Sequence, residues 1–264
     1  MELDLAGRVA VVTGASRGIG LAVTETLVAE GVHVVAGARS PGHELEELTR
    51  AGKAHALAVD LGTADGPGRL VELALNELGR VDILVNNVGA VTPRPNGFLL
   101  VTDEEWTRSI TLNLLSAVRA TREVLPTMVT AGRGSVVTIA SINAHLPDPG
   151  VIDYSAAKAA LVNFTKSVSK EFGPHGVRAN AINPGPVATD LWLGTGGVAE
   201  TVAAGSGATA GAVADEAASH AVTGRFTQPA EVANLAAFLA ADRVAGNITG
   251  ATFTLDGGYT TETH

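Results

Sequence analysis

Short apolar segments alternate with longer segments of helical periodicity along most of the chain. The short segments are rich in valine and isoleucine, as is typical of strands. They lie at Arg8–Thr13, Val32–Ala38, Ala54–Val59, Val81–Asn86, Ser135–Ser141, Val177–Ile182 and Thr252–Leu255. The first, fourth and fifth are almost continuously apolar, which indicates parallel strands that are buried on both faces.

The segments between these strands have the periodicity of helices. They lie at Ile19–Glu30, Glu44–Ala51, Gly68–Leu78, Asp103–Val129, Ile152–Phe172 and Pro229–Ala241. Thr102, with Glu105 three residues later, predicts a capping box at the start of the fourth helix. Regular alternation of strands and helices favours right-handed crossovers. The sequence therefore predicts an α/β fold of Rossmann type, a doubly wound parallel sheet of about seven strands with helices on both faces.

One stretch departs from this alternation. Residues Gly185–Gly224 contain eight glycines and many alanines, with only a weak helical pattern at Val198–His220. A long excursion of this kind inside a compact domain is usually functional. We therefore predict a single domain over residues 1–264 with a mobile insertion, at about 190–224, that closes over a ligand.

Composition narrows the class of protein. The chain has 264 residues, 31 glycines, no cysteine and a net charge of −9, from 18 basic and 27 acidic residues. The negative charge argues against a nucleic-acid or anionic-membrane partner. Without cysteine there is no disulfide and no thiolate nucleophile or metal ligand. No apolar run approaches the roughly 18 residues of a membrane span, and the acidic start is unlike a secretory signal. We expect a cytoplasmic protein.

A glycine-rich turn follows the first strand and leads into the first helix. Gly14, Gly18 and Gly20 lie in the segment Thr13-Gly14-Ala15-Ser16-Arg17-Gly18-Ile19-Gly20. Such a turn lets backbone N–H groups and a helix N-terminus meet a pyrophosphate. The alternative interpretation is an ordinary tight turn, but the position after the first buried strand favours dinucleotide binding.

Tyr154 and Lys158 are separated by four residues on a predicted helix, so the phenol and the ammonium group share one face. A nearby cation lowers a phenol pKa toward the range in which tyrosine works as an acid or base. The alternative is a half-buried tyrosine beside a surface lysine. Ser141 ends the fifth strand, at the edge where parallel sheets place ligands, and it precedes Tyr154 by 13 residues.

These motifs resemble those of the short-chain dehydrogenase/reductase family in its single-domain form, and the resemblance covers nearly the whole chain. The glycine turn resembles the family's T-G-x-x-x-G-x-G motif, and Asn86-Asn87-Val88-Gly89 resembles its N-N-A-G, with Val88 where alanine is usual. Pro184-Gly185 resembles the segment beside nicotinamide. Within this family, the whole chain resembles the 3-oxoacyl-(acyl-carrier-protein) reductases.

The resemblance implies a catalytic tetrad of Asn113, Ser141, Tyr154 and Lys158. In this scheme Ser141 stabilises the substrate oxygen, Tyr154 transfers the proton, Lys158 holds the ribose and lowers the tyrosine pKa, and Asn113 positions a relay water. Asp60 and Leu61 would meet adenine, and Thr189 the carboxamide. The predicted cofactor contacts are Gly14, Ser16, Arg17, Gly18, Ile19, Gly20, Arg39, Asp60, Leu61, Asn87, Gly89, Tyr154, Lys158, Pro184, Gly185, Val187 and Thr189.

The end of the second strand indicates which nicotinamide cofactor is used. Folds that prefer NAD usually carry an acid there, whereas this chain has Ala38 followed by Arg39, and Arg17 lies inside the glycine turn. Two guanidinium groups without an acid suit the 2′-phosphate of NADP(H). The alternative interpretation is two solvated loop arginines, with NAD(H) as the cofactor.

The substrate is less well defined. His145, Leu146 and Trp192 are candidate contacts for a partly apolar small molecule, although the pattern favours a loop histidine that faces water over a substrate contact for His145. The histidines form no metal-binding motif, so no metal is expected. We predict an NADP(H)-dependent oxidoreductase for a carbonyl or secondary alcohol, with a 3-oxoacyl reductase as one form. The alternatives are an alcohol dehydrogenase of a sugar, steroid or secondary metabolite, and a non-catalytic NADP-binding sensor or scaffold. The resemblance further implies a homotetramer or homodimer.

Overall fold

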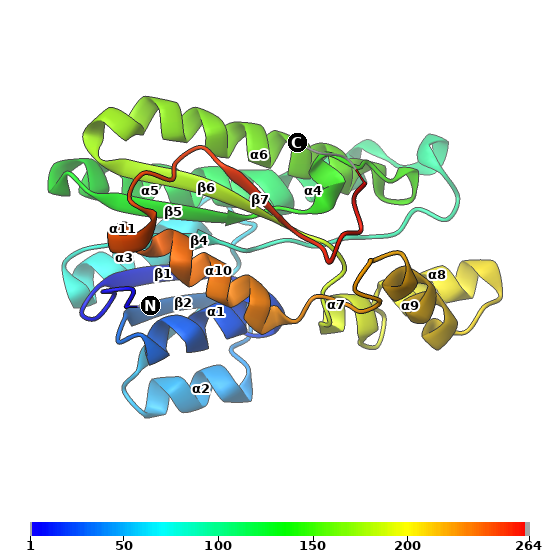
Figure 1. Ribbon diagram of the computed structural model, residues 1–264, viewed down its shortest axis with the longest axis horizontal. Helices are drawn as coiled ribbons and strands as arrows, with labels where there is room; N and C mark the ends of the chain where they lie inside the picture. The colour runs from blue at the N-terminus through cyan, green and yellow to red at the C-terminus, as the bar shows by residue number, and fades with distance from the viewer. Residues whose placement is uncertain (1, 262–264) are drawn as a thin grey trace.

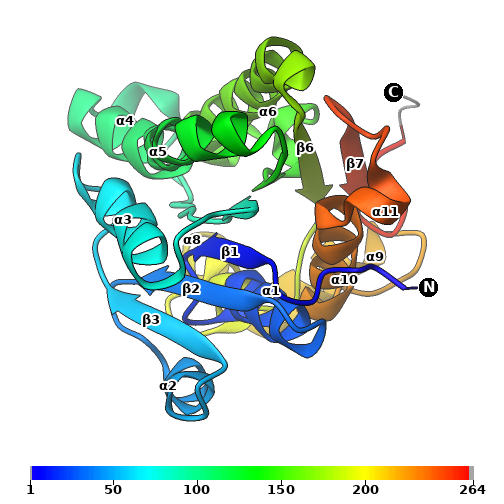
Figure 2. The ribbon, with the colours of Figure 1, turned by 90° about the vertical axis from the view of Figure 1, so that its left-hand side faces the viewer.

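In the computed structural model, which describes residues 2–261, seven strands pair in parallel to form one sheet. The strand order is β3-β2-β1-β4-β5-β6-β7, and Figure 2 shows β3, β2 and β1 on one side of the sheet and β6 and β7 on the other. The strands are β1 (Val9–Thr13), β2 (His33–Ala38), β3 (Ala54–Ala58), β4 (Ile83–Asn86), β5 (Gly134–Ile139), β6 (Val177–Pro184) and β7 (Thr252–Leu255). The order and the parallel pairing confirm the predicted doubly wound Rossmann-type α/β fold.

Helices cover both faces of the sheet (Figures 1 and 2). Helices α1 (Gly18–Ala29) and α10 (Pro229–Ala240) pack together on one face, with α2 (His43–Arg50) and α11 (Asp242–Ala245) nearby. Helices α3 (Gly66–Leu78), α5 (Ser116–Ala131) and α6 (Ile152–Phe172) cover the other face, and α4 (Asp103–Ile110) extends α5.

Strand β1 explains why the sheet has two hydrophobic cores. Its residues are all buried, and successive side chains of a strand point to opposite faces. Val12 belongs to the core beneath α1 and α10, whereas Val11 belongs to the core beneath α3 and α5. A strand between two helical layers therefore needs apolar side chains on both faces, and the sequence of β1 provides them in a nearly continuous apolar run.

The helix predicted over Asp103–Val129 is interrupted. Helix α4 ends at Ile110, a π-helical turn spans Thr111–Leu115, and α5 begins at Ser116. The predicted capping box is present, because the Thr102 side chain accepts from the Glu105 backbone and the Glu105 carboxylate accepts from the Thr102 N–H. π-helical turns are rare and are frequent at functional sites, and this one contains Asn113.

The glycine-rich insertion forms three helices at the carboxyl edge of the sheet (Figure 1). They are α7 (Asp190–Leu193), α8 (Val198–Ser206) and α9 (Ala210–Ser219). The weak helical pattern at Val198–His220 thus corresponds to two helices rather than one, because α8 ends at Gly207. None of the helices in the described part of the chain is long and apolar enough to cross a membrane.

Candidate active site

The glycine turn lies where the strand order reverses, between β1 and β4, which is where doubly wound sheets bind ligands. Gly14 and Gly18 have positive φ angles of 68° and 56°, a conformation that side chains with a Cβ rarely adopt. A Cβ atom on Gly20 would clash with the carbonyl oxygen of Gly14 and would lie 2.5 Å from Asn87 Nδ2. The glycines therefore let the start of α1 approach the turn closely, and they leave backbone N–H groups accessible.

Asn87, just after β4, braces the turn. Its Nδ2 donates to the carbonyl oxygens of Thr13 and Gly14, each at 3.0 Å, and its backbone N–H donates to Thr13 Oγ1 at 2.9 Å. Val88, the departure from the family motif, packs its Cγ2 against Gly14. These contacts join the ends of β1 and β4 into one rigid wall.

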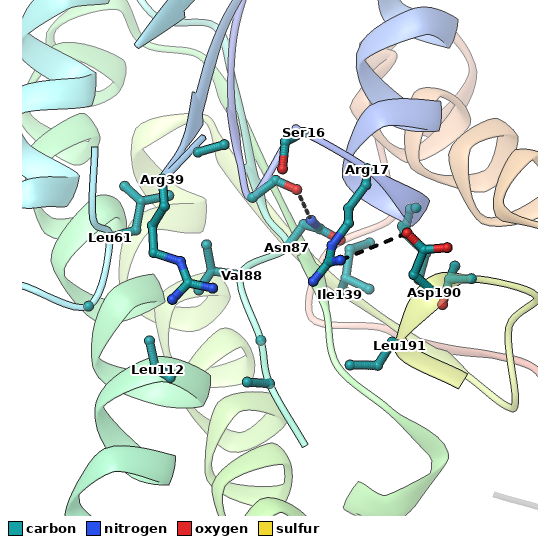
Figure 3. A pocket seen from close by; sticks show the side chains of 18 of the residues that line it. Ser16, Arg17, Arg39, Leu61, Asn87, Val88, Leu112, Ile139, Asp190 and Leu191 are labelled. Atoms are coloured by element: carbon teal, nitrogen blue, oxygen red, sulfur yellow. Dashed lines mark hydrogen bonds and ion pairs between the residues drawn. The ribbon is translucent and has the colours of Figure 1, made fainter. Parts of the chain in front are cut away.

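A cleft runs from the glycine turn to Tyr154, and Figure 3 shows Ser16, Arg39 and Asn87 among the side chains around it. Most of the predicted cofactor contacts line it, namely Gly14, Ser16, Arg17, Gly18, Ile19, Arg39, Asp60, Leu61, Asn87, Gly89, Tyr154, Lys158 and Thr189. Gly20 lies behind the turn, where it allows close packing against Gly14 but does not line the cleft. Pro184, Gly185 and Val187 line a neighbouring cavity instead.

The two arginines of the cleft have different surroundings (Figure 3). Arg17 forms an ion pair with Asp190 of α7, with Nη1 and Oδ2 3.8 Å apart and both side chains exposed. Arg39 lies near Asp60 and Leu112 and also lines an adjoining hollow beside α4. The sequence did not indicate the Arg17–Asp190 pair, because the two residues are far apart in the chain.

Tyr154 and Lys158 lie on α6 as the four-residue spacing requires. The lysine Nζ is 5.6 Å from the centre of the tyrosine ring and donates to the carbonyl oxygen of Ile139 at 2.9 Å. Burial lowers the pKa of Lys158 to about 8. Burial also raises the pKa of the Tyr154 phenol, and a hydrogen bond with Ser141 opposes this rise only in part. The predicted lowering of the tyrosine pKa by Lys158 is therefore wrong for this structure: desolvation is the dominant effect.

Ser141 follows β5 and is within hydrogen-bond reach of the Tyr154 phenol. Its hydroxyl donates to Asn143 Oδ1 at 3.1 Å and accepts from the Asn143 backbone N–H at 3.2 Å. Asn143 thus fixes the serine hydroxyl beside Tyr154. Sequence reasoning missed Asn143; its position two residues after Ser141, where a side chain can bond to a neighbouring turn, was the available signal.

Asn113 is hydrogen-bonded to the backbone of Ala90, next to the other tetrad residues. Its Oδ1 accepts from the Ala90 N–H at 3.0 Å, and its Nδ2 donates to the Ala90 carbonyl at 2.9 Å. Gly89 is enclosed between Asn113 and Lys158, since a Cβ there would lie 3.0 Å from Asn113 Oδ1 and 3.3 Å from Lys158 Nζ. The structure therefore brings all four predicted tetrad residues to one region, with Asn113 behind the wall of the cleft.

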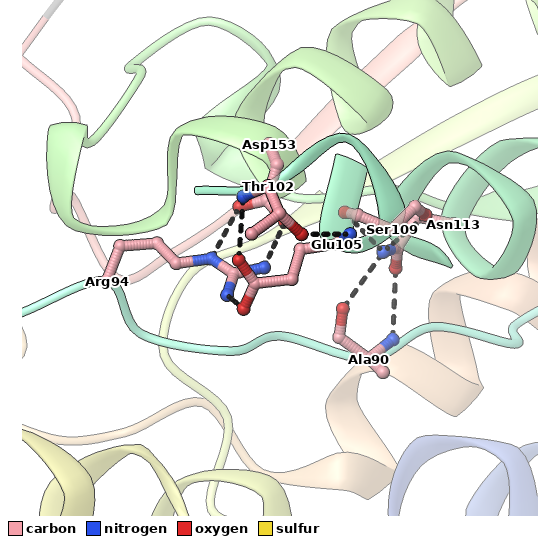
Figure 4. A network of polar contacts seen from close by, with 7 residues as sticks. All are labelled: Ala90, Arg94, Thr102, Glu105, Ser109, Asn113 and Asp153. Atoms are coloured by element: carbon pink, nitrogen blue, oxygen red, sulfur yellow. Dashed lines mark hydrogen bonds and ion pairs between the residues drawn. The ribbon is translucent and has the colours of Figure 1, made fainter. Parts of the chain in front are cut away.

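A buried ion pair adjoins the tetrad (Figure 4). Arg94, after β4, donates to Asp153 through Nε at 3.3 Å and Nη2 at 2.8 Å, and through Nη1 to Glu105. The Arg94 and Asp153 side chains are only 9% and 3% exposed. Burial would raise the pKa of Asp153, but hydrogen bonds and the charge of Arg94 outweigh it and hold this pKa below its usual value. Ser109 also bonds to Asp153, which joins this network to Asn113.

A second cavity of about 840 Å³ adjoins the cleft, and Tyr154 lines both. Ser141, Leu146 and Trp192 line this cavity, and α8 and α9 of the insertion form one side of it. His145, the remaining predicted substrate contact, is exposed and is not among the described residues that line either space. Within residues 2–261, no group of three His, Cys, Asp or Glu side chains is placed to hold a metal ion.

Comparisons with known proteins agree with this geometry. The family model for short chain dehydrogenases matches residues 8–195. A 3-oxoacyl-(acyl-carrier-protein) reductase from Synechocystis sp. is 35% identical over 259 residues, covering 96% of this chain and 97% of that protein. The corresponding reductase of Escherichia coli is 35% identical over 257 residues, covering 97% of this chain and 98% of that protein.

Solved structures of similar fold include an L-sorbose reductase from Gluconobacter frateurii in complex with NADPH and L-sorbose. Its TM-score is 0.91 at 33% identity, and the match covers 100% of both chains. An aldohexose dehydrogenase from Thermoplasma acidophilum has a TM-score of 0.87 at 29% identity, over 100% of this chain and 98% of that one. The chain belongs to the short-chain dehydrogenase/reductase family of oxidoreductases.

Proposed function

We propose that this protein is an NADP(H)-dependent oxidoreductase that reduces a carbonyl group to a secondary alcohol, with Tyr154 as the general acid. The observation that carries this proposal is the position of Tyr154, which lines both the glycine-walled cleft and the neighbouring cavity. A proton donor at this boundary can reach a substrate in one space while a cofactor occupies the other.

The cleft fits a dinucleotide. An added Cβ at Gly20 would collide with Gly14, and Gly14 and Gly18 adopt positive φ angles, so the glycines give the turn the close packing that it needs beside the cleft. Backbone N–H groups at the start of α1 would hold the pyrophosphate, and Arg39 would pair with a 2′-phosphate. The NADPH in the L-sorbose reductase complex supports the choice of NADP(H) over NAD(H).

Each residue of the tetrad then has a chemical task. Bound NADPH supplies the hydride. Because burial raises its pKa, the Tyr154 phenol is protonated at neutral pH, so it can give its proton to the carbonyl oxygen. The Ser141 hydroxyl turns from Asn143 to donate to the same oxygen. Lys158 holds the ribose, and Asn113 fixes the backbone at Ala90 and supports a relay of protons from solvent.

A protonated phenol is the form that the reducing direction needs, in which Tyr154 gives its proton to the carbonyl oxygen. A 3-oxoacyl thioester is one candidate substrate, supported by the similarity to 3-oxoacyl-(acyl-carrier-protein) reductases. A sugar is the second, supported by the similarity to L-sorbose reductase and aldohexose dehydrogenase. We further propose that α7–α9 act as a lid of a single domain, and that the chain works in the cytoplasm as a homotetramer or homodimer.

The test is a screen for NADPH oxidation with 3-oxoacyl thioesters, ketosteroids, quinones and keto sugars, in the wild type and in Tyr154→Phe. We expect turnover with at least one class, and a variant that binds NADPH but has lost at least about 100-fold in kcat. Turnover of the variant near wild type would refute the role of Tyr154. NADPH binding without turnover of any class would instead support the non-catalytic sensor or scaffold.

A further inference from the structure

The cavity next to Tyr154 has a distinctive charge distribution. Its lining is mainly apolar and includes Ile142, Leu146, Val151, Trp192 and Val213. Arg94 is the only lysine or arginine among the described residues that line it. A carboxylate or phosphate on a substrate would therefore need Arg94 as its counter-ion.

Arg94 is already paired (Figure 4). Three of its N–H groups bond to the carboxylates of Asp153 and Glu105, and only 9% of its side chain is exposed. Two carboxylates on one guanidinium group leave no positive charge for a ligand. A substrate anion that recruited Arg94 would leave Asp153 buried without a partner, which is costly.

Two carboxylates also line the cavity. Asp148, from the loop before α6, and Glu216, from α9, both line it, together with His220 and Tyr259. His220 Nδ1 lies 3.4 Å from the Tyr259 hydroxyl. Burial raises the pKa of Tyr259, and the charges of Asp148 and Glu216 raise it further. Asp148 and Glu216 are both solvent-exposed and line the cavity, so they place negative charge at its border.

We propose that the cavity selects uncharged, largely apolar carbonyl compounds and rejects those that carry a carboxylate or phosphate. This inference rests on the proposed function, in which the cavity holds the substrate. Most of the exposed lining surface is apolar, so a sugar would lose hydrogen bonds to water wherever its hydroxyl groups meet that surface.

Trp192 lines the cavity and can report binding without any turnover. The chain has two tryptophans, so Trp106→Phe leaves Trp192 as the only one. Quenching of its fluorescence is measured near pH 8, where an ordinary imidazole is neutral. The probes are methyl 7-oxooctanoate, the 7-oxooctanoate anion of the same skeleton, and L-sorbose. We expect the ester to bind about tenfold more tightly than the anion, from the repulsion of nearby carboxylates, and more tightly than L-sorbose.

The double variant Asp148→Asn/Glu216→Gln should bring the affinities of ester and anion to within about threefold. Glu171→Gln, an exposed acid of α6 outside both spaces, is the matched control and should leave the preference unchanged. Equal or tighter binding of the anion by the Trp106→Phe protein, tighter binding of L-sorbose, or no saturable quenching by the ester would each overturn the inference. Binding of the ester by a protein that never oxidises NADPH would contradict the proposed function alone.

Discussion

The buried pair of Arg94 and Asp153 gives a quantitative prediction about stability. Arg94→Met keeps the length and the apolar stem of the side chain but leaves the Asp153 carboxylate, 3% exposed, without its bidentate partner. Removing one member of a buried pair typically costs about 3–5 kcal/mol. At about 2–4 °C per kcal/mol for a chain near this size, Tm should fall by about 6–20 °C.

The same variant should show a defined pH dependence. In the wild type the pKa of Asp153 is held below its usual value, so its stabilising effect is present above that usual value and is lost as pH falls through the folded pKa. In Arg94→Met the unpaired carboxyl has a raised pKa, so its penalty disappears when acid protonates it. The difference in stability between the two proteins should therefore shrink as pH falls to about 4.

Urea unfolding followed by circular dichroism near pH 8 and near pH 4 measures both effects. The double variant Arg94→Met/Asp153→Asn removes both charges and should recover at least about half of the loss near pH 8. A single variant that loses under about 1 kcal/mol, or whose deficit is the same at both pH values, would refute the assignment of a buried ion pair.

Three further predictions concern the cleft. Arg39→Asp should weaken NADPH at least about tenfold more than NADH in kcat/KM, because the new carboxylate repels a 2′-phosphate; equal losses would contradict the cofactor assignment. Gly20→Ala should abolish binding of NADPH measured by its fluorescence, since the added Cβ collides with Gly14 and Asn87, and a variant that binds normally would contradict the close packing of the turn. Lys158→Met should abolish turnover and yet raise Tm near pH 7, because burial lowers the lysine pKa to about 8, which shows that the buried ammonium group destabilises the fold. This destabilisation is complete below about pH 8 and fades as pH rises toward the ordinary pKa of 10.5, so the gain in Tm should vanish in strong alkali.

The local pattern of apolar residues and motifs in the sequence was sufficient to predict the fold and most of the residues that line the cleft. Strand β1 and helix α6 follow from apolar runs and periodicity, because each is buried along its length or on one face. The glycine turn and the pair Tyr154 and Lys158 are local in sequence, so their spacing carries the geometry. The π-helical turn was missed because one extra residue in a turn barely changes the apolar pattern of the surrounding helix.

The contacts that sequence reasoning missed are long-range. Arg94 and Asp153 are 59 residues apart and meet only because the ends of β4 and α6 converge. Asp82 likewise receives Arg8 and Arg133 from distant segments. The raised pKa of Tyr154 depends on how completely the fold buries the phenol, which a spacing of four residues does not encode. Such features follow from tertiary packing, which the sequence pattern indicates only in outline.

The central claim is that a hydride passes from a nicotinamide cofactor to a carbonyl carbon beside Tyr154. The most direct test is to incubate the protein with NADPH that carries deuterium at both C4 positions and with the best substrate of the screen, and to analyse the alcohol by mass spectrometry. We predict one deuterium on the new carbinol carbon with the wild type, and at least about 100-fold less labelled alcohol from Tyr154→Phe over the same initial-rate period. Cofactor oxidation that leaves no deuterium on that carbon, or an equal amount of labelled alcohol formed by the variant in that period, would contradict the account.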